Sequence, residues 1–178
     1  MTMSSQQGAL VRPASARVLR HLTADAFRRF GQVLEPDAAY TVNGGFADRT
    51  DVLTRLAHVE AAPQLCLSYF DVRPVALPAT ITTLEAHPYS AQVFLPASRS
   101  RPIVVVALAG ADGLPDPETL ETFLGMPGQA ILYDPGVWHA GLTTAGEPGG
   151  FLMAMWRGEH PDTEVQPLPR PVVVDVAE

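Results

Sequence analysis

The sequence predicts a mainly β fold, a barrel or a sandwich with about two short helices. Many short apolar or alternating runs have the length and pattern of β-strands. Seventeen prolines and fourteen glycines are scattered between these runs and act as turn signals. Only two segments look helical, which is too few for parallel βαβ units, and no phosphate-binding glycine loop is present.

The expected strands are spread along the whole chain. A short strand over residues 17–22 comes first. Eight further runs, each bounded by Pro, Gly or Asp, are expected at 65–72, 79–87, 92–95, 102–109, 129–133, 139–143, 151–156 and 172–176.

The first expected helix covers residues 23–31. Thr23 is suited to cap its beginning, because a threonine hydroxyl can accept a hydrogen bond from a free backbone N–H of the first turn. Phe27 and Phe30 lie three positions apart, on one face. Gly31 provides a suitable end.

The second expected helix covers residues 117–124. Asp116 can cap it, and Pro117 suits the first helical position because that N–H is not used in the helix. Gly125 would end it. The expected apolar face consists of Leu120, Phe123 and Leu124.

Chain length and composition limit the possible classes of protein. A chain of 178 residues favours one domain, expected here over residues 17–178 after a mobile leader at 1–16. Neither a signal peptide nor a membrane-spanning run is apparent, so the expected location is the cytoplasm. Cys66 is the only cysteine, which excludes an internal disulfide.

The charge of the chain excludes two further classes. A net charge of -7 and a pI near 5.1 argue against a general nucleic-acid binder, which needs clustered positive charge. The chain contains no lysine, so Schiff-base chemistry through a lysine is impossible. A small-molecule partner is the remaining expectation.

Two short segments carry most of the candidate chemistry, LEAHPYSAQ at residues 84–92 and DPGVWH at 134–139. Together they offer a carboxylate, two imidazoles and an amide: Glu85, His87, Gln92 and His139. In a small barrel these groups could converge on one divalent ion, and the mixed oxygen and nitrogen set suits nickel, manganese, iron or zinc.

The local sequence supports a shared direction for the first three of these side chains. Alternate residues of a strand face the same side, so Glu85 and His87 can point together. Pro88 favours an extended backbone at His87. The turn that follows resets the alternation, which lets Gln92 return to that face.

Two alternatives stay open for these residues. A single histidine on a strand is more often structural than a ligand. Without a metal, Glu85 or His87 would be the base and His139 the acid of an acid–base mechanism. Tyr133 and Trp138 flank the second segment, where they could form core or pocket wall.

The two segments also resemble the two motifs of cupins, and the larger pattern resembles the ureidoglycolate lyase family. LEAHPYSAQVFLPAS, PIVVVALAG, PDPETLETFL and GQAILYDPGVWHAGL carry this resemblance, in that order. It implies a cupin-like (jelly-roll) β-barrel, a homodimer, and cleavage of (S)-ureidoglycolate to glyoxylate and urea during allantoin and purine breakdown. Nickel is associated with the family.

The resemblance also implies site residues. It points to Glu85, His87, Gln92 and His139, and the segment NGGFADR adds Asn43 and Arg49 as candidates for substrate binding. Tyr133 and Trp138 match family positions near the second motif and are further candidates for substrate binding.

Several basic residues of the family pattern are missing. Asp71, Ala86 and Ala140 stand at positions that are usually basic. Since arginine is the natural partner of a substrate carboxylate, either Arg49, Arg73 or Arg157 compensates or the substrate differs. The alternatives are a cupin isomerase or hydrolase for another small hydroxy acid or amide, and a non-catalytic cupin that binds a metabolite.

Overall fold

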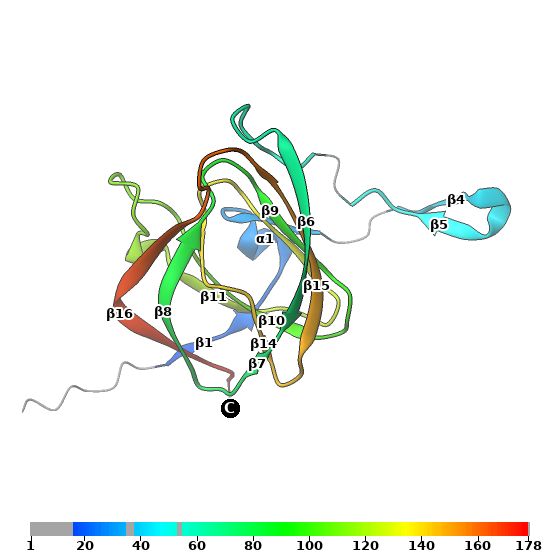
Figure 1. The fold of residues 1–178 in the computed structure, drawn as a ribbon. Helices are drawn as coiled ribbons and strands as arrows, with labels where there is room; N and C mark the ends of the chain where they lie inside the picture. Colours follow the sequence, from blue (N-terminus) through cyan, green and yellow to red (C-terminus); the bar gives the residue numbers. More distant parts are fainter. Residues whose placement is uncertain (1–15, 35–37, 53–54, 178) are drawn as a thin grey trace, which may run out of the picture.

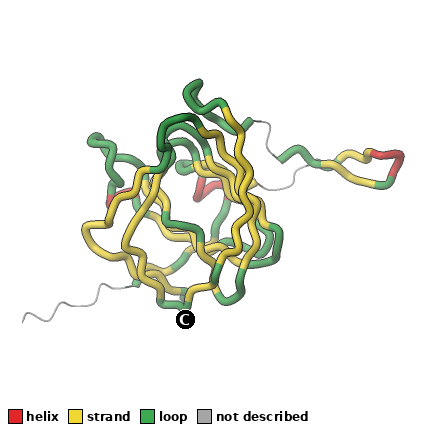
Figure 2. Tube along the Cα trace, in the orientation of Figure 1, coloured by secondary structure: helices red, strands yellow, loops and turns green. Residues whose placement is uncertain are grey.

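A computed structural model of the chain describes residues 16–34, 38–52 and 55–177, so the predicted leader lies outside the described residues except for Ala16. Two β-sheets curve around a common interior, and strands make up most of the trace (Figures 1 and 2). The prediction of a mainly β barrel with a few short helices is confirmed. Within the described residues, no helix is long and apolar enough to cross a membrane.

The larger sheet has nine strands. Its main path, in spatial order, is β1 (Arg17–Val18), β16 (Glu164–Asp175), β8 (Ala79–Ala86), β13 (Trp138–His139), β10 (Arg101–Ala107), β11 (Glu121–Leu124) and β2 (Arg20–His21). Off this path, β14 (Thr143–Ala145) pairs with β10 and β7 (Pro74–Val75) pairs with β14.

The smaller sheet has five strands. In spatial order these are β3 (Gly31–Leu34), β12 (Ala130–Tyr133), β9 (Gln92–Pro96), β15 (Gly149–Arg157) and β6 (Gln64–Val72). All of its pairings are antiparallel. The strand β6 lies at one edge and pairs only with β15 among the described strands.

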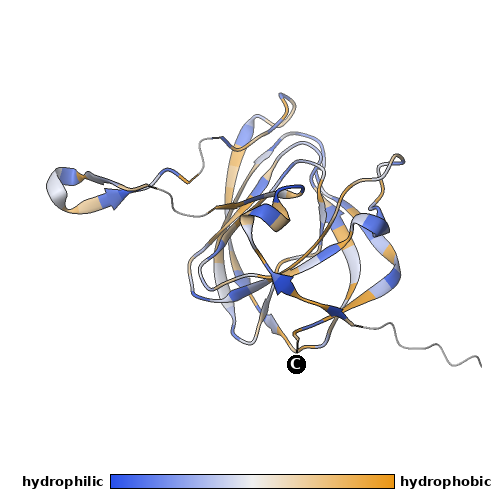
Figure 3. Cartoon of the chain, turned by 180° about the vertical axis from the view of Figure 1, so that it is seen from behind, coloured by the Kyte–Doolittle hydropathy of each residue, from blue (hydrophilic) through white to orange (hydrophobic). Residues whose placement is uncertain are grey.

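The main core fills the space between the two sheets. Val104 and Val106 of β10 meet Phe94, Met153 and Met155 of the smaller sheet there. Neighbouring residues of β10 belong to a second buried cluster on the other face of the larger sheet, as strand alternation requires. Both faces of β10 are therefore apolar, whereas other strands carry both hydrophobic and hydrophilic residues (Figure 3).

The first predicted helix is confirmed, although it is short. It is α1 (Ala24–Phe27), and the Thr23 hydroxyl accepts a hydrogen bond from the Ala26 N–H at 3.3 Å. Phe27 and Phe30 are both buried in the main core.

The second predicted helix, at 117–124, is wrong. The capping prediction is correct, because Asp116 accepts from the Glu118 N–H at 2.9 Å, but only one 3-10 turn forms, η2 (Pro117–Thr119). The chain then enters β11, which lies between β10 and β2. Pairing on both sides satisfies the backbone and buries Phe123 on one face and Leu124 on the other, which outweighs the local helical pattern.

The strand β16 is much longer than the predicted segment 172–176. It pairs with β8 along most of its length, with an irregularity between Pro167 and Val172. On its other side, β1 covers only Val174 and Asp175. The prolines of β16 are tolerated because they lie where one side of the strand is unpaired.

A separate hairpin stands away from the barrel (Figure 1). It consists of β4 (Tyr40–Val42), the turn η1 (Asn43–Gly45) and β5 (Ala47–Arg49), which form their own two-stranded sheet. Phe46 at its tip is 94% exposed.

Candidate functional site

Glu85 and His139 form a cross-strand pair between β8 and β13. They are direct partners in the antiparallel register, and His139 is likewise opposite Val106 of β10. Since Val106 belongs to the main core, these side chains share the inner face of the larger sheet. Glu85 Oε1 lies 3.7 Å from His139 Nε2.

His87 follows β8 directly and connects the two sequence motifs. The Gly136 N–H donates to the His87 carbonyl at 3.0 Å, and Gly136 has a φ of 76°, which favours glycine. This turn holds the DPG segment against the end of β8. The rings of His87 and His139 consequently lie with their centroids 5.4 Å apart.

Gln92 comes to the same place from the smaller sheet. It pairs with Tyr133 of β12 and with Met155 of β15, and both neighbours belong to the main core. Its Nε2 lies 3.0 Å from His87 Nε2. Its buried Oε1 has no hydrogen-bond partner among the described residues.

Backbone carbonyls determine which ring nitrogens hold protons. A carbonyl can only accept, so Nδ1 of His87 donates to Asp162 at 3.2 Å and Nδ1 of His139 donates to Val137 at 3.0 Å. In a neutral ring Nε2 is then the acceptor, and the Nε2 of His87 faces the Gln92 amide nitrogen at 3.0 Å. The one on His139 is buried without a hydrogen-bond partner in the described part of the chain.

Burial keeps His139 neutral. Its pKa is lowered from 6.5 to about 3: desolvation is the main cause, the hydrogen bond to Val137 opposes it, and the neighbouring His87 adds a smaller lowering effect. The contact with Glu85 is therefore not an ion pair near neutral pH. His139 also lacks the proton that the sequence-based acid role would need.

Tyr133 lies flat against the His139 ring. The ring centroids are 4.2 Å apart at an interplanar angle of 8°. Burial raises the pKa of the Tyr133 phenol, and the negative charge of Glu85 raises it further. Tyr133 therefore stays protonated and fixes the orientation of the imidazole.

These residues fit a divalent metal ion. Glu85, His87 and His139 each offer a ligand atom, and the three atoms lie within 4.8 Å of one another. The unpartnered Oε1 of Gln92 would supply a further oxygen. Neutral imidazoles whose other nitrogen is held by a backbone carbonyl are typical metal ligands.

The other predicted site residues lie elsewhere. Asn43 and Arg49 belong to the separate hairpin, where Arg49 pairs with Asp51 at 2.7 Å. Trp138 belongs to the buried cluster on the opposite face of the larger sheet, and its indole N–H donates to the Gly113 carbonyl at 3.1 Å. The structure therefore brings five of the eight candidates together: Glu85, His87, Gln92, Tyr133 and His139.

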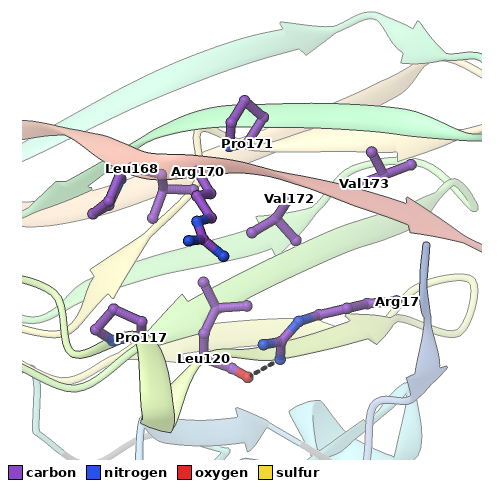
Figure 4. Close-up of a pocket in the computed structure, with 9 residues that line it drawn as sticks. Arg17, Pro117, Leu120, Leu168, Arg170, Pro171, Val172 and Val173 are labelled. Carbon is purple, nitrogen blue, oxygen red and sulfur yellow. Dashed lines mark hydrogen bonds between the residues drawn. The ribbon is translucent and has the colours of Figure 1, made fainter. Parts of the chain in front are cut away.

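A groove on β16 is separate from this cluster (Figure 4). It has a volume of about 380 Å³ and lies between the irregular part of β16 and Leu120, whose carbonyl accepts from Arg17 at 2.7 Å. None of the clustered residues lines it. The side-chain chemistry, and not the cavity volume, identifies the candidate site.

Sequence reasoning missed the residues that hold His87 in place. Asp162 contributes its carbonyl, and the Thr163 hydroxyl lies 3.4 Å from His87 Nδ1. Both belong to the polar segment GEHPDTE, which follows β15 and has no local signal of a site.

Comparison with known proteins identifies the family. The sequence profile of the ureidoglycolate lyase family matches residues 16–175. The chain belongs to the ureidoglycolate lyase family. A ureidoglycolate lyase from Mesorhizobium japonicum is 35% identical over 147 residues, covering 82% of this chain and 88% of that protein. One from Rhodobacter capsulatus is 32% identical over 162 residues, covering 89% and 97%.

A solved structure shows a more distant likeness. A dTDP sugar isomerase from Desulfovibrio desulfuricans has a TM-score of 0.43 and 14% identity, covering 78% of this chain and 85% of that one. The family resemblance expected from the two motifs is confirmed by the sequence comparisons.

Proposed function

We propose that this protein cleaves (S)-ureidoglycolate into glyoxylate and urea. Membership of the ureidoglycolate lyase family over residues 16–175 supports this reaction. The observation that carries the proposal is the convergence of Glu85, His87 and His139 on the inner face of the barrel. No other cluster of this kind occurs among the described residues.

The reaction requires two proton transfers, one from the hydroxyl oxygen and one to the urea nitrogen, and both of these atoms are bonded to the same carbon atom. The hydroxyl loses its proton as the carbonyl of glyoxylate forms, and the bond to the urea nitrogen breaks as that nitrogen gains a proton. We assign both movements to Glu85, whose side chain is 34% exposed and can reach a bound substrate. The His139 ring is neutral and its Nε2 carries no proton, so it is better suited to binding than to donating.

We also propose that the cluster binds a divalent metal ion. One carboxylate oxygen of Glu85, together with His87 and His139, would hold it, with Gln92 as a further ligand. The second oxygen of Glu85 would then stay available for the proton transfers. When bound, such an ion lowers the pKa of a coordinated hydroxyl group and orients the substrate. Asp162 and Val137 keep both imidazoles in the tautomer that this requires.

The test measures glyoxylate and urea released from (S)-ureidoglycolate by the purified protein, with and without added nickel or manganese. Glu85→Gln should lower kcat by at least about 100-fold, the contribution typical of a lost acid–base group. His139→Ala should abolish turnover. His21→Ala, which changes an exposed histidine of β2, is the matched control and should behave as wild type.

The possible results test the site and the substrate separately. Equimolar glyoxylate and urea, lost in both site variants, would support the reaction and the site. Wild-type rates in both variants would reject the site. A folded wild-type protein that releases neither product would reject the substrate and favour another small hydroxy acid or amide.

We further propose that the protein is a homodimer. Leu65, Leu67 and Tyr69 alternate along the edge strand β6 and are 51%, 69% and 58% exposed. Leu152 of β15 lies opposite Tyr69 and extends this apolar surface. An exposed apolar edge strand is suited to pairing with a second copy of the chain. A cytoplasmic location stays a prediction.

A further inference from the structure

Apart from the proposed metal ion, the cluster contains no permanent positive charge, because none of its side chains is an arginine or a lysine. Glu85 is a carboxylate, and His87 and His139 are imidazoles. The substrate assumed in the proposed function, on which this inference depends, carries a carboxylate. Such a group is bound best by an arginine, whose planar guanidinium can donate two parallel hydrogen bonds.

Two of the three arginines that could compensate lie far from the cluster. Arg73 follows the end of β6 that pairs with Gly149, whereas Met155 beside Gln92 is six residues further along β15. Six strand residues span about 20 Å. Arg49 lies on the separate hairpin and is paired with Asp51.

Arg157 lies at the end of β15 that is close to the cluster, two residues after Met155, the partner of Gln92. Met153, Met155 and Arg157 alternate along β15, and both methionines face the main core. Alternation therefore directs Arg157 to the inner side as well, where β15 ends. Its Nη2 lies 3.8 Å from the Met155 sulfur, which in turn is 3.9 Å from Gln92 Nε2.

A second line of contacts leads from Arg157 to His87. Arg157 lines a cavity of about 360 Å³ with the segment that follows β15. Two residues of that segment, Asp162 and Thr163, contact Nδ1 of His87. Two routes thus connect Arg157 to the His87 ring. One runs through Met155 and Gln92, and the other runs through the segment that contains Asp162.

The guanidinium of Arg157 is available for a ligand. Glu159 and Asp162 also line the cavity, yet neither forms an ion pair with Arg157 in the described structure. Its only recorded polar contact there is the weak one to the Met155 sulfur. Arg157 therefore keeps most of its five N–H donors free.

We infer that Arg157 binds the carboxylate of the substrate and so orients the reacting carbon towards Glu85. It takes the place of the basic side chains that are missing at Asp71, Ala86 and Ala140. The bond between substrate and guanidinium forms in the ground state and persists in the transition state. Its loss should therefore raise KM more than it lowers kcat.

The test is steady-state kinetics of Arg157→Met, Arg157→Lys and, as a matched control, Arg73→Met. A lost charge-assisted hydrogen bond predicts that Arg157→Met raises KM by about 10- to 100-fold. Arg157→Lys should restore part of the affinity, because it keeps the charge without the bidentate geometry. Arg73→Met should leave KM unchanged. A wild-type KM in Arg157→Met, or a raised KM in Arg73→Met alone, would overturn the inference.

Calorimetric titration with glyoxylate separates this inference from the proposed function. Glyoxylate carries the same carboxylate, and its binding needs no turnover. If wild type releases no products but binds glyoxylate at least 10-fold more tightly than Arg157→Met does, the role of Arg157 stands and the reaction is wrong. Equal affinities in the two proteins would overturn the role of Arg157 whatever the turnover.

Discussion

His139 shows how strongly one buried position changes the chemistry of a side chain. Its Nδ1 is fixed by Val137, Tyr133 covers one face of the ring, and Nε2 is directed to Glu85. Together these contacts leave a neutral ring with one free lone pair. The same histidine in a solvated loop would gain and lose a proton near neutral pH.

The neutral state of His139 predicts a pH dependence of stability in the metal-free protein. The folded pKa of about 3 lies below the unfolded value of 6.5, so the unfolded chain binds more protons between these values. This contribution is complete above pH 6.5 and is lost as the pH falls towards 3. Its slope should be about 1.4 kcal/mol per pH unit.

Urea unfolding of chelator-treated wild type and His139→Gln at pH 7.0, 6.0 and 5.0 measures this slope. The free energy of unfolding of wild type should fall more steeply with acid than that of the variant. His21→Gln is the control and should keep the wild-type slope. Equal slopes in wild type and His139→Gln would show that His139 is not neutralised by folding.

The residue cluster also predicts metal content. Wild-type protein loaded with nickel or manganese and then desalted should retain about one ion per chain, measured by elemental analysis. His87→Ala removes one of the three converging ligands and should lower the affinity by at least about 10-fold. His58→Ala, which changes a histidine stacked on Trp156, should retain the ion. Equal retention in both variants would contradict the assigned ligands.

At the scale of single elements, strand pairing decides positions that local sequence leaves open. Gly31 begins β3 opposite Tyr133 of β12, with a φ of 145°. A Cβ at this position would collide with the backbone carbonyl of Leu132. Glycine is therefore required here both by backbone conformation and by close approach, whereas the sequence suggested only the end of a helix.

Gly31→Ala is expected to lower the free energy of unfolding by more than about 2 kcal/mol, because backbone strain and the collision act together. Gly44→Ala is the matched comparison, since Gly44 has a φ of 66° but open space around the added Cβ. That change should cost only about 1–2 kcal/mol. Thermal and urea unfolding measure both values. Equal losses would show that the Leu132 carbonyl moves aside.

At the scale of the whole molecule, the outer side of β6 is an exposed apolar surface. Its apolar residues lie on the opposite face of the strand from Val72, which is in the main core. The barrel itself does not need these residues for its interior. A second copy of the chain that covers these residues would explain why they are apolar.

Leu67→Glu should weaken the dimer by at least about 100-fold, because a charge would be buried without a partner at the centre of the interface. Sedimentation velocity at micromolar concentration measures the change. Leu114→Glu is the control, since Leu114 is exposed in a loop outside this surface. A monomeric wild type, or an unchanged dimer in Leu67→Glu, would contradict the proposed interface.

The sequence by itself determined the fold class, the first helix and the clustered site residues. Strand alternation, turn residues and the Pro88 restriction act over a few positions, so they can be read directly from the chain. Glu85, His87 and Gln92 were placed on one face in this way, whereas His139 was added because the segment at 134–139 resembles the second cupin motif. Their convergence in the barrel agrees with that expectation.

Only the tertiary structure decided the remaining features. Segment 117–124 became a strand because β10 and β2 satisfy its backbone. Trp138 faces away from His139 because β13 begins at Trp138, one residue before the predicted strand. The tautomer and low pKa of His139, and the place of Arg157 beside Met155, depend on residues far away in the chain. Such effects come from burial and long-range pairing, which local patterns do not encode.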